Sequence, residues 1–295
     1  MPGTLRHGVN RLATPRPALW VGALLALMAA SLLLRTGALD AGYWIDEGIS
    51  VGIASHDVRD IPGALGQDGN PPLYYLLLHG WMRIFGMTEA ATRALSLLFA
   101  LLSIPASFWA GTRLFSRRAG VLAAAGAAGA PFLTYYAQET RMYSLVVLLS
   151  ILASASFALA FVRGERKHVV YLGVWLALLL YTHTWGVFLV VAMSAVWLHL
   201  RRRGEVDTGD GVRLLIVLAV AYLPWLPVIL FQAQHTAAPW AERPSPLVLL
   251  IIPAGLFGHI ATPLLAIAIF FAVRRRPRDT TEASASSSGP ISTAE

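Results

Sequence analysis

Long apolar stretches alternate with short polar segments along most of the sequence. A helix needs about 20 apolar residues to cross the hydrocarbon core of a bilayer, so stretches of this length predict membrane-spanning helices. We expect them at residues 17–36, 90–112, 119–137, 142–162, 168–184, 186–201, 212–231 and 247–273. The pattern therefore predicts an all-α polytopic membrane protein with about eight transmembrane helices.

A further apolar segment, residues 71–86, is short and contains His79 and Arg83. If it does not cross, the arginine-rich runs after the second, fourth, sixth and eighth spans share a side with the N-terminal arginines. If it crosses, those runs lie on the opposite side. Because Lys and Arg collect in cytoplasmic loops, the first arrangement is favoured. We therefore expect 71–86 to be an interfacial helix within a first outer loop at residues 37–89.

This topology divides the chain into three parts. Residues 1–16 form a cytoplasmic N-terminus, residues 17–273 form the transmembrane module, and residues 274–295 form a polar, Ser-rich cytoplasmic tail that we expect to be disordered. The first apolar segment is long enough to span and has no convincing small-residue cleavage site, so it is expected to be a permanent anchor. The expected location is the plasma membrane, with the outer loops carrying the functional site.

Composition agrees with this class. Hydrophobic residues make up 56% of the chain and charged residues 13%, and the mean hydropathy of +0.61 lies far outside the range of a soluble domain. The net charge of +7 does not indicate nucleic-acid binding, because the basic residues punctuate apolar spans instead of forming one solvated face. With no cysteine, disulfides and thiolate metal sites are excluded.

Two adjacent acids, Asp46 and Glu47, lie a few residues beyond the first span, in the segment YWIDEGIS. A carboxylate near the membrane surface suits a general base. Acids in the first turn of a helix also stabilise its dipole, and GISVGIASH after them is a plausible short helix. From the pair alone, a catalytic base and a helix cap are equally good interpretations.

The segment YYAQETRMY, residues 135–143, places Tyr136, Glu139 and Arg141 at an outer turn. Arg93 begins the second span on the same side. Arginines on the outer side oppose the positive-inside tendency, and a guanidinium near the membrane surface suits a phosphate group. For Arg141, a salt bridge to Glu139 or contact with lipid headgroups is the structural alternative.

Histidines give weaker indications. His79 is most simply a hydrogen-bonded interfacial residue, and the same applies to His183, although its neighbour Trp185 would let this outer turn stack on a sugar. No spacing among the histidines and acids predicts a metal site. No cofactor is indicated, and a divalent metal remains open.

The ordered motifs WIDEG, NPPLYYLLLHGWMRIFG with TEAATRALS, LFSRRAGVLAAA and YYAQETRMYSL are similar to those of the GT-C superfamily of membrane glycosyltransferases. The resemblance covers roughly residues 17–200 and is to the family 39 type, which includes protein O-mannosyltransferases and the lipid A aminoarabinose transferase. It implies a helical module with surface helices in the first outer loop. It also implies Asp46 as the base, Glu47 as its companion and Arg141 at a lipid phosphate.

The implied activity is inverting transfer of a mannose-like or related sugar from a polyprenyl phosphate to a protein, lipid or glycan acceptor outside the membrane. Typical relatives are longer, often with an extracytoplasmic C-terminal domain, so a binder of lipid-linked sugar without turnover is one alternative. A transporter or flippase is another, although transporters usually place their polar groups near the bilayer midplane. A structural subunit of a cell-envelope complex would leave WIDEG and YYAQETR without a role.

Overall fold

The computed structural model describes residues 17–235, together with residues 252, 262, 263, 266 and 267. In this part of the chain every element is helical, which confirms the all-α prediction. The elements are α1 Pro17–Leu34, α2 Ile45–Ser55, α3 Ile61–Asp68, α4 Leu73–Phe85, α5 Glu89–Leu114, α6 Arg117–Gly129, α7 Pro131–Tyr136, α8 Tyr143–Phe157, π-helix Ala158–Val162, α9 Lys167–Thr182, α10 Gly186–Arg202, α11 Thr208–Tyr222, 3₁₀-helix Leu223–Trp225 and α12 Leu226–His235.

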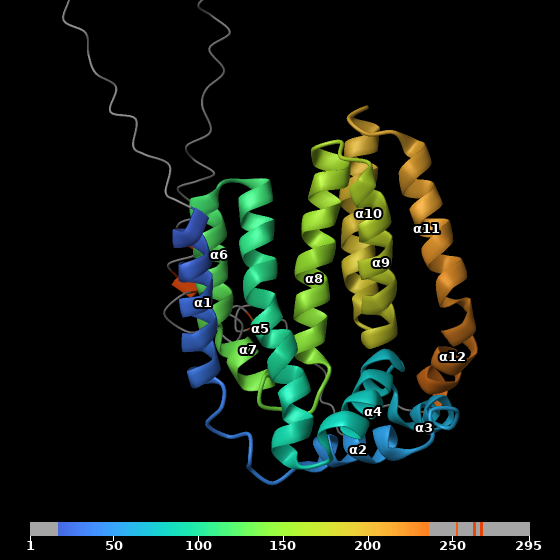
Figure 1. Ribbon diagram of the computed structural model, residues 1–295. Helices are drawn as coiled ribbons and strands as arrows, with labels where there is room; N and C mark the ends of the chain where they lie inside the picture. The colour runs from blue at the N-terminus through green and yellow to red at the C-terminus, as the bar shows by residue number, and fades with distance from the viewer. Residues whose placement is uncertain (1–16, 236–251, 253–261, 264–265, 268–295) are drawn as a thin grey trace, which may run out of the picture. The chain divides into compact units, whose positions relative to one another are not determined.

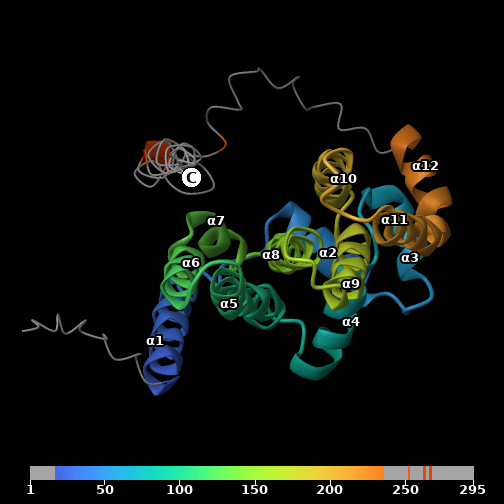
Figure 2. The same cartoon turned by 90° about the horizontal axis from the view of Figure 1, so that it is seen from above.

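The long helices run up and down between two ends of a bundle (Figure 1). The short helices α2, α3 and α4 all lie at one end, together with the α7–α8 and α9–α10 turns. The α5–α6, α8–α9 and α10–α11 turns lie at the opposite end. Seen along the helices, α5 lies between α6 and α8, and α9 lies between α8 and α11 (Figure 2). The prediction of short helices within residues 37–89 is confirmed.

Three helical segments of the described residues are long and apolar enough to cross a membrane: Glu89–Leu114, Tyr143–Val162 and Thr208–Gln232. Two shorter apolar helices, Ala18–Leu34 and Lys167–Thr182, run alongside them. The predicted span at 247–273, the N-terminus 1–16 and the tail 274–295 lie wholly or almost wholly outside the described residues.

Three predicted spans depart from a regular α-helix. The expected continuous helix at 119–137 is wrong, because it breaks at Ala130, whose ψ of 121° is extended. Pro131 follows, and proline lacks the N–H that a continuing helix needs and disfavours helical geometry at the residue before it. Pro224 similarly lies in the 3₁₀ turn between α11 and α12, and Pro227 is the second residue of α12. A π-helical turn ends the span that begins at Tyr143.

Close contact between α5 and α6 depends on two glycines. A Cβ atom added at Gly111 would lie 2.8 Å from the Cα of Gly120, and one added at Gly120 would lie 2.7 Å from the carbonyl oxygen of Phe108. These distances are too short for any side chain, so the backbones approach as they do in small-residue packing of membrane helices. Gly126 and Gly129, farther along α6, face open space.

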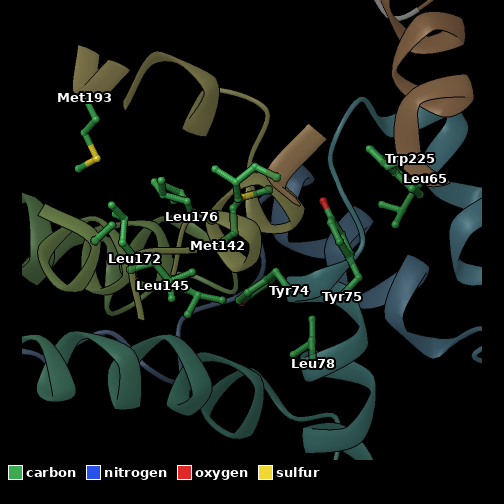
Figure 3. Packing of buried hydrophobic residues seen from close by; sticks show 14 of the residues in the cluster. Leu65, Tyr74, Tyr75, Leu78, Met142, Leu145, Leu172, Leu176, Met193 and Trp225 are labelled. Atoms are coloured by element: carbon green, nitrogen blue, oxygen red, sulfur yellow. The ribbon is translucent and has the colours of Figure 1, made fainter. Parts of the chain in front are cut away.

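The short helices are fixed to the bundle by a shared apolar core. Tyr74, Tyr75 and Leu78 of α4 are fully buried and belong to the same apolar cluster as Met142 and Leu145, around the start of α8 (Figure 3). Gln232 of α12 donates a hydrogen bond of 2.8 Å to the carbonyl oxygen of Leu65 in α3. This core holds the end of the bundle that carries the predicted site residues.

Candidate active site

Asp46 and Arg141 come together at the end of the bundle that carries α2. Arg141 Nη2 lies 3.7 Å from Asp46 Oδ2, and Arg141 Nη1 donates to the Asp46 carbonyl oxygen at 3.3 Å. The Arg141 side chain is only 8% exposed, whereas that of Asp46 is 42% exposed. A nearly buried cation thus stands beside a carboxylate that solvent can reach.

Ser50 fixes this arrangement from one turn along α2. Its Oγ donates to the Asp46 carbonyl oxygen at 2.8 Å and accepts from Arg141 Nη1 at 3.3 Å. The Nε atom of Arg141 is buried without a hydrogen-bond partner among the described residues. A buried N–H group without a partner is costly, so this atom is available to an incoming acceptor such as a phosphate oxygen.

Glu47, the second acid of the pair, is engaged in the protein interior. Its carboxylate accepts from Arg93 Nε at 2.8 Å and from Arg93 Nη2 at 2.7 Å, and the two side chains are 1% and 3% exposed. It also accepts from the backbone N–H of Trp44, so the helix-cap interpretation applies to Glu47. Burial would raise the pKa of Glu47, but the bonds from Arg93, Thr140 and Trp44 lower it overall.

Arg93 has no free donor in this arrangement. Besides Glu47, it donates to four backbone carbonyl oxygens of the segment that joins α1 to α2, those of Ala38, Leu39, Ala41 and Gly42. The guanidinium therefore holds the first part of the 37–89 loop against α5. Its geometry favours positioning over direct contact with a substrate.

Glu47 also sets the distance between Asp46 and Arg141. Its Oε1 accepts from the backbone N–H of Thr140 at 2.8 Å. Since Glu47 follows Asp46 and Thr140 precedes Arg141, this bond holds the two site residues in register across 95 positions of sequence. The link depends on a side-chain-to-backbone bond that sequence patterns do not reveal.

A chain of hydroxyl groups supports the turn that carries Arg141. Ser96 Oγ donates to the Arg141 carbonyl oxygen at 3.0 Å and lies 3.1 Å from the hydroxyl of Tyr74. Thr92 Oγ1 lies 2.9 Å from Thr140 Oγ1. Sequence analysis missed these residues and Ser50. Only Ser50 had a usable indication, because position i+4 from Asp46 lies on the same face of a helix.

Glu139, two residues before Arg141, is buried, and its Oε2 atom has no hydrogen-bond partner among the described residues. Burial, and to a smaller extent the charge of Glu47, raise the pKa of Glu139. Glu139 therefore binds a proton more tightly than Glu47, whose pKa is lowered. Two neighbouring acids in opposite environments are typical of a functional site.

Aromatic rings line the approach to Arg141. The Tyr143 ring centroid lies 5.8 Å from the guanidinium carbon, 4.3 Å from the Tyr136 ring and 5.8 Å from the His183 ring. Burial and the charge of Arg141 lower the pKa of His183, so its ring is neutral at pH 7. The His183 Nδ1 atom accepts from the backbone N–H of Trp185 at 3.1 Å, which leaves its Nε2 as the proton donor.

His79 is hydrogen-bonded to a different part of the structure. Its Nδ1 atom is 2.9 Å from the carbonyl oxygen of Ala54, so it joins α4 to α2. Among the described residues, no group of three or more His, Asp or Glu side chains could hold a metal ion. The site as described is a carboxylate, a guanidinium and a set of aromatic rings.

Comparison with known proteins gives both a sequence and a structural match. The profile of the dolichyl-phosphate-mannose-protein mannosyltransferase family matches residues 69–231, more than half of the chain. No curated protein sequence matches the chain. The family match includes Arg93, Glu139 and Arg141 but begins after Asp46.

Several solved structures share the fold. ArnT from Cupriavidus metallidurans in the apo state matches with a TM-score of 0.64 at 20% identity, over 88% of this chain and 52% of that protein. The same protein bound to undecaprenyl phosphate matches with a TM-score of 0.63 at 18% identity, over 86% of this chain and 52% of that one. An oligosaccharyltransferase from Archaeoglobus fulgidus, tethered to an acceptor peptide, matches with a TM-score of 0.55 at 14% identity, over 88% and 38%. The chain thus spans about half the length of ArnT and a smaller part of the oligosaccharyltransferase.

Proposed function

The chain belongs to the dolichyl-phosphate-mannose-protein mannosyltransferase family, within the GT-C superfamily, and on that premise we propose that it is a membrane glycosyltransferase. The donor is a sugar on a polyprenyl phosphate, and the acceptor carries a hydroxyl group. The observation that carries the proposal is the half-exposed carboxylate of Asp46 beside the nearly buried guanidinium of Arg141. The structure of ArnT bound to undecaprenyl phosphate supports a lipid phosphate as the ligand class.

In this proposal Arg141 binds the phosphate. Its unpartnered Nε and its two Nη atoms form a planar fork that matches phosphate oxygens. At 3.7 Å, the contact with Asp46 is at the long end of an ion pair, so a phosphodiester whose oxygens accept two hydrogen bonds from the guanidinium competes well for it. Phosphate binding would therefore release Asp46 from its contact with Arg141 and would bring the attached sugar to it.

Asp46 acts as the general base. It takes the proton from the acceptor hydroxyl, the oxygen attacks the anomeric carbon, and the bond from that carbon to the phosphate oxygen breaks with inversion. Glycosidases need a second carboxyl group to protonate their leaving group. A lipid phosphate leaves as a stable anion, so one base is sufficient, and Arg141 stabilises the charge that develops on the phosphate.

Glu47 and Arg93 act as positioning residues. Both are buried in their mutual ion pair, and Glu47 fixes the Thr140 backbone next to Arg141. Tyr136, Tyr143 and His183 provide ring faces for a sugar. The neutral His183 and the buried oxygen of Glu139 are suited to hydrogen bonds with sugar hydroxyl groups. We place the site on the outer face of the plasma membrane, since the arginine-rich turns lie at the opposite end.

The proposal is tested by sugar transfer in proteoliposomes. Full-length protein is supplied with radiolabelled polyprenyl-phosphate sugars and a membrane extract as the source of acceptor, and Asp46→Asn is compared with the wild type. Loss of a general base typically lowers the rate by about 10²- to 10⁴-fold. Asp57→Asn, an exposed acid in the loop after α2, is the matched control and should keep full activity.

Equal transfer by the wild type and Asp46→Asn would remove the assignment of Asp46 as the base. The transporter alternative predicts a different result. In that case neither protein transfers label, but the labelled lipid changes leaflet in the presence of both.

A further inference from the structure

A cavity of about 360 Å³ opens at the end of the bundle opposite the candidate active site, between α5, α8 and α9. This volume lies within the range of small-molecule binding sites. Polar and charged groups from all three helices line it, including Arg113, Ser156, Lys167 and His168. None of them takes part in the proposed transfer reaction.

Two of the lining side chains are buried without hydrogen-bond partners. Ser156 is fully buried and its Oγ has no partner among the described residues. His168 is 4% exposed; its Nε2 lies 3.4 Å from Glu165 Oε2 without hydrogen-bond geometry, and its Nδ1 also lacks a partner. Since buried polar atoms are nearly always paired, two such groups in one cavity indicate a polar occupant.

The charges at the mouth of the cavity favour an anion. Lys167 is exposed and makes no ion pair among the described residues. Arg113 is paired with Glu165 at 2.7 Å, and Arg163 donates to the carbonyl oxygen of Leu114 without an acid partner in the described chain. Among the described residues, Lys167 is therefore the lining cation without an ion pair, next to the paired Arg113.

The cavity becomes apolar with depth. On α9, Trp175 follows Lys167 by eight residues, about 12 Å along the helix. Trp109, Leu152 and Tyr171 line the same deeper part. Tyr171 is 50% exposed, so the cavity reaches the outer surface of the bundle. A soluble anion would use only the mouth, whereas a lipid would fill both regions.

We propose that this cavity binds an anionic phospholipid of the leaflet opposite the candidate active site. The phosphate lies between Lys167 and Arg113, and Ser156 and His168 bond to polar oxygens of the headgroup and glycerol. The part of one acyl chain nearest the glycerol packs against Trp109 and Trp175. The rings of Trp and Tyr favour this position at the membrane interface. The site is independent of sugar transfer.

Lysine chemistry tests the proposal, because Lys167 is the only lysine in the sequence. The full chain is placed in nanodiscs of phosphatidylcholine, with or without phosphatidylglycerol. A neutral amine-reactive ester is added, and acylation of Lys167 is followed by peptide mass spectrometry relative to the N-terminal amine. Phosphatidylglycerol should slow acylation of Lys167 by about tenfold, the effect of one hydrogen bond to a charged group. Inorganic phosphate should give no protection.

Ser156→Phe, which fills the cavity, should abolish the protection. Equal acylation in both lipids, protection by inorganic phosphate, or protection that persists in Ser156→Phe would each overturn the proposal. If Ser156→Phe does not fold, native mass spectrometry decides the question with two other variants. Lys167→Gln should lose retained phosphatidylglycerol, and Arg117→Gln, an exposed arginine at the same end but outside the cavity, should keep it. Equal retention by both variants would contradict the site.

Discussion

The Asp46 carboxylate lies 3.7 Å from the Arg141 guanidinium, although the two residues are 95 positions apart in the sequence. The contact brings α2 to the α7–α8 turn and places an accessible acid beside a nearly buried cation. Glu47, the residue after Asp46, accepts a hydrogen bond from the backbone N–H of Thr140, the residue before Arg141. The proposed catalytic pair is therefore supported by a neighbouring pair that is wholly internal.

Arg141→Gln should reduce use of the lipid donor. Loss of hydrogen bonds to a charged phosphate predicts a fall of about 10- to 100-fold in kcat/KM for the polyprenyl-phosphate sugar. Arg141→Lys should recover part of this loss, because it restores the charge but not the planar fork. Arg83→Gln, an exposed arginine on α4, is the control. Unchanged donor kinetics in Arg141→Gln would remove its phosphate role.

Glu47→Gln should destabilise the fold as well as lower activity. Removing one partner of a buried ion pair leaves the other uncompensated, which costs about 3–5 kcal/mol. The melting temperature in detergent should therefore fall clearly. Glu205→Gln breaks an exposed pair with Arg203 and should have little effect. Similar melting temperatures for the Glu47→Gln variant and the wild type would show that the ion pair does not hold the site together.

The stabilising effect of Glu47 should depend on pH in a defined direction. The folded protein lowers the pKa of Glu47 below its ordinary value of 4.5, so the ionised form is favoured by folding. The stabilisation is fully present above that value and is lost as pH falls through the lowered pKa. The difference in melting temperature between the wild type and Glu47→Gln should shrink below about pH 4.5. A difference that is constant or grows under acid conditions would contradict this assignment.

Two glycine substitutions test the packing of α5 against α6. Gly111→Ala should lower the melting temperature, because the new Cβ would lie 2.8 Å from the backbone of Gly120. Gly126→Ala on α6 meets open space and should be neutral or stabilising by up to about 1 kcal/mol, since it removes helix-interior glycine. If the two variants melt alike, the close approach of the helices is not required.

The sequence predicted the helical class and the short helices within residues 37–89, because apolar length and arginine distribution are properties of local sequence. It placed Asp46 and Arg141 at the same end of the bundle for the same reason. It did not predict the break at Pro131, although a proline there is itself a local indication. The tight contacts at Gly111 and Gly120 depend on how α5 and α6 pack, which no local sequence pattern specifies.

The roles within the site were harder to predict. Glu47 and Arg93 carry charges that suit chemistry, yet their partners are each other and backbone groups brought in by tertiary packing. Ser96 and Thr92 are ordinary helix residues in sequence and become supports only because α5 faces the turn that carries Arg141. The cavity near Lys167 likewise depends on how three helices pack.

The most direct measurement is a cryo-EM structure of the full chain with a polyprenyl-phosphate sugar. We expect phosphate oxygens about 3 Å from the Arg141 guanidinium nitrogens and the anomeric carbon of the sugar facing Asp46. A donor phosphate bound at the other end of the bundle, or with its sugar out of reach of Asp46, would contradict it.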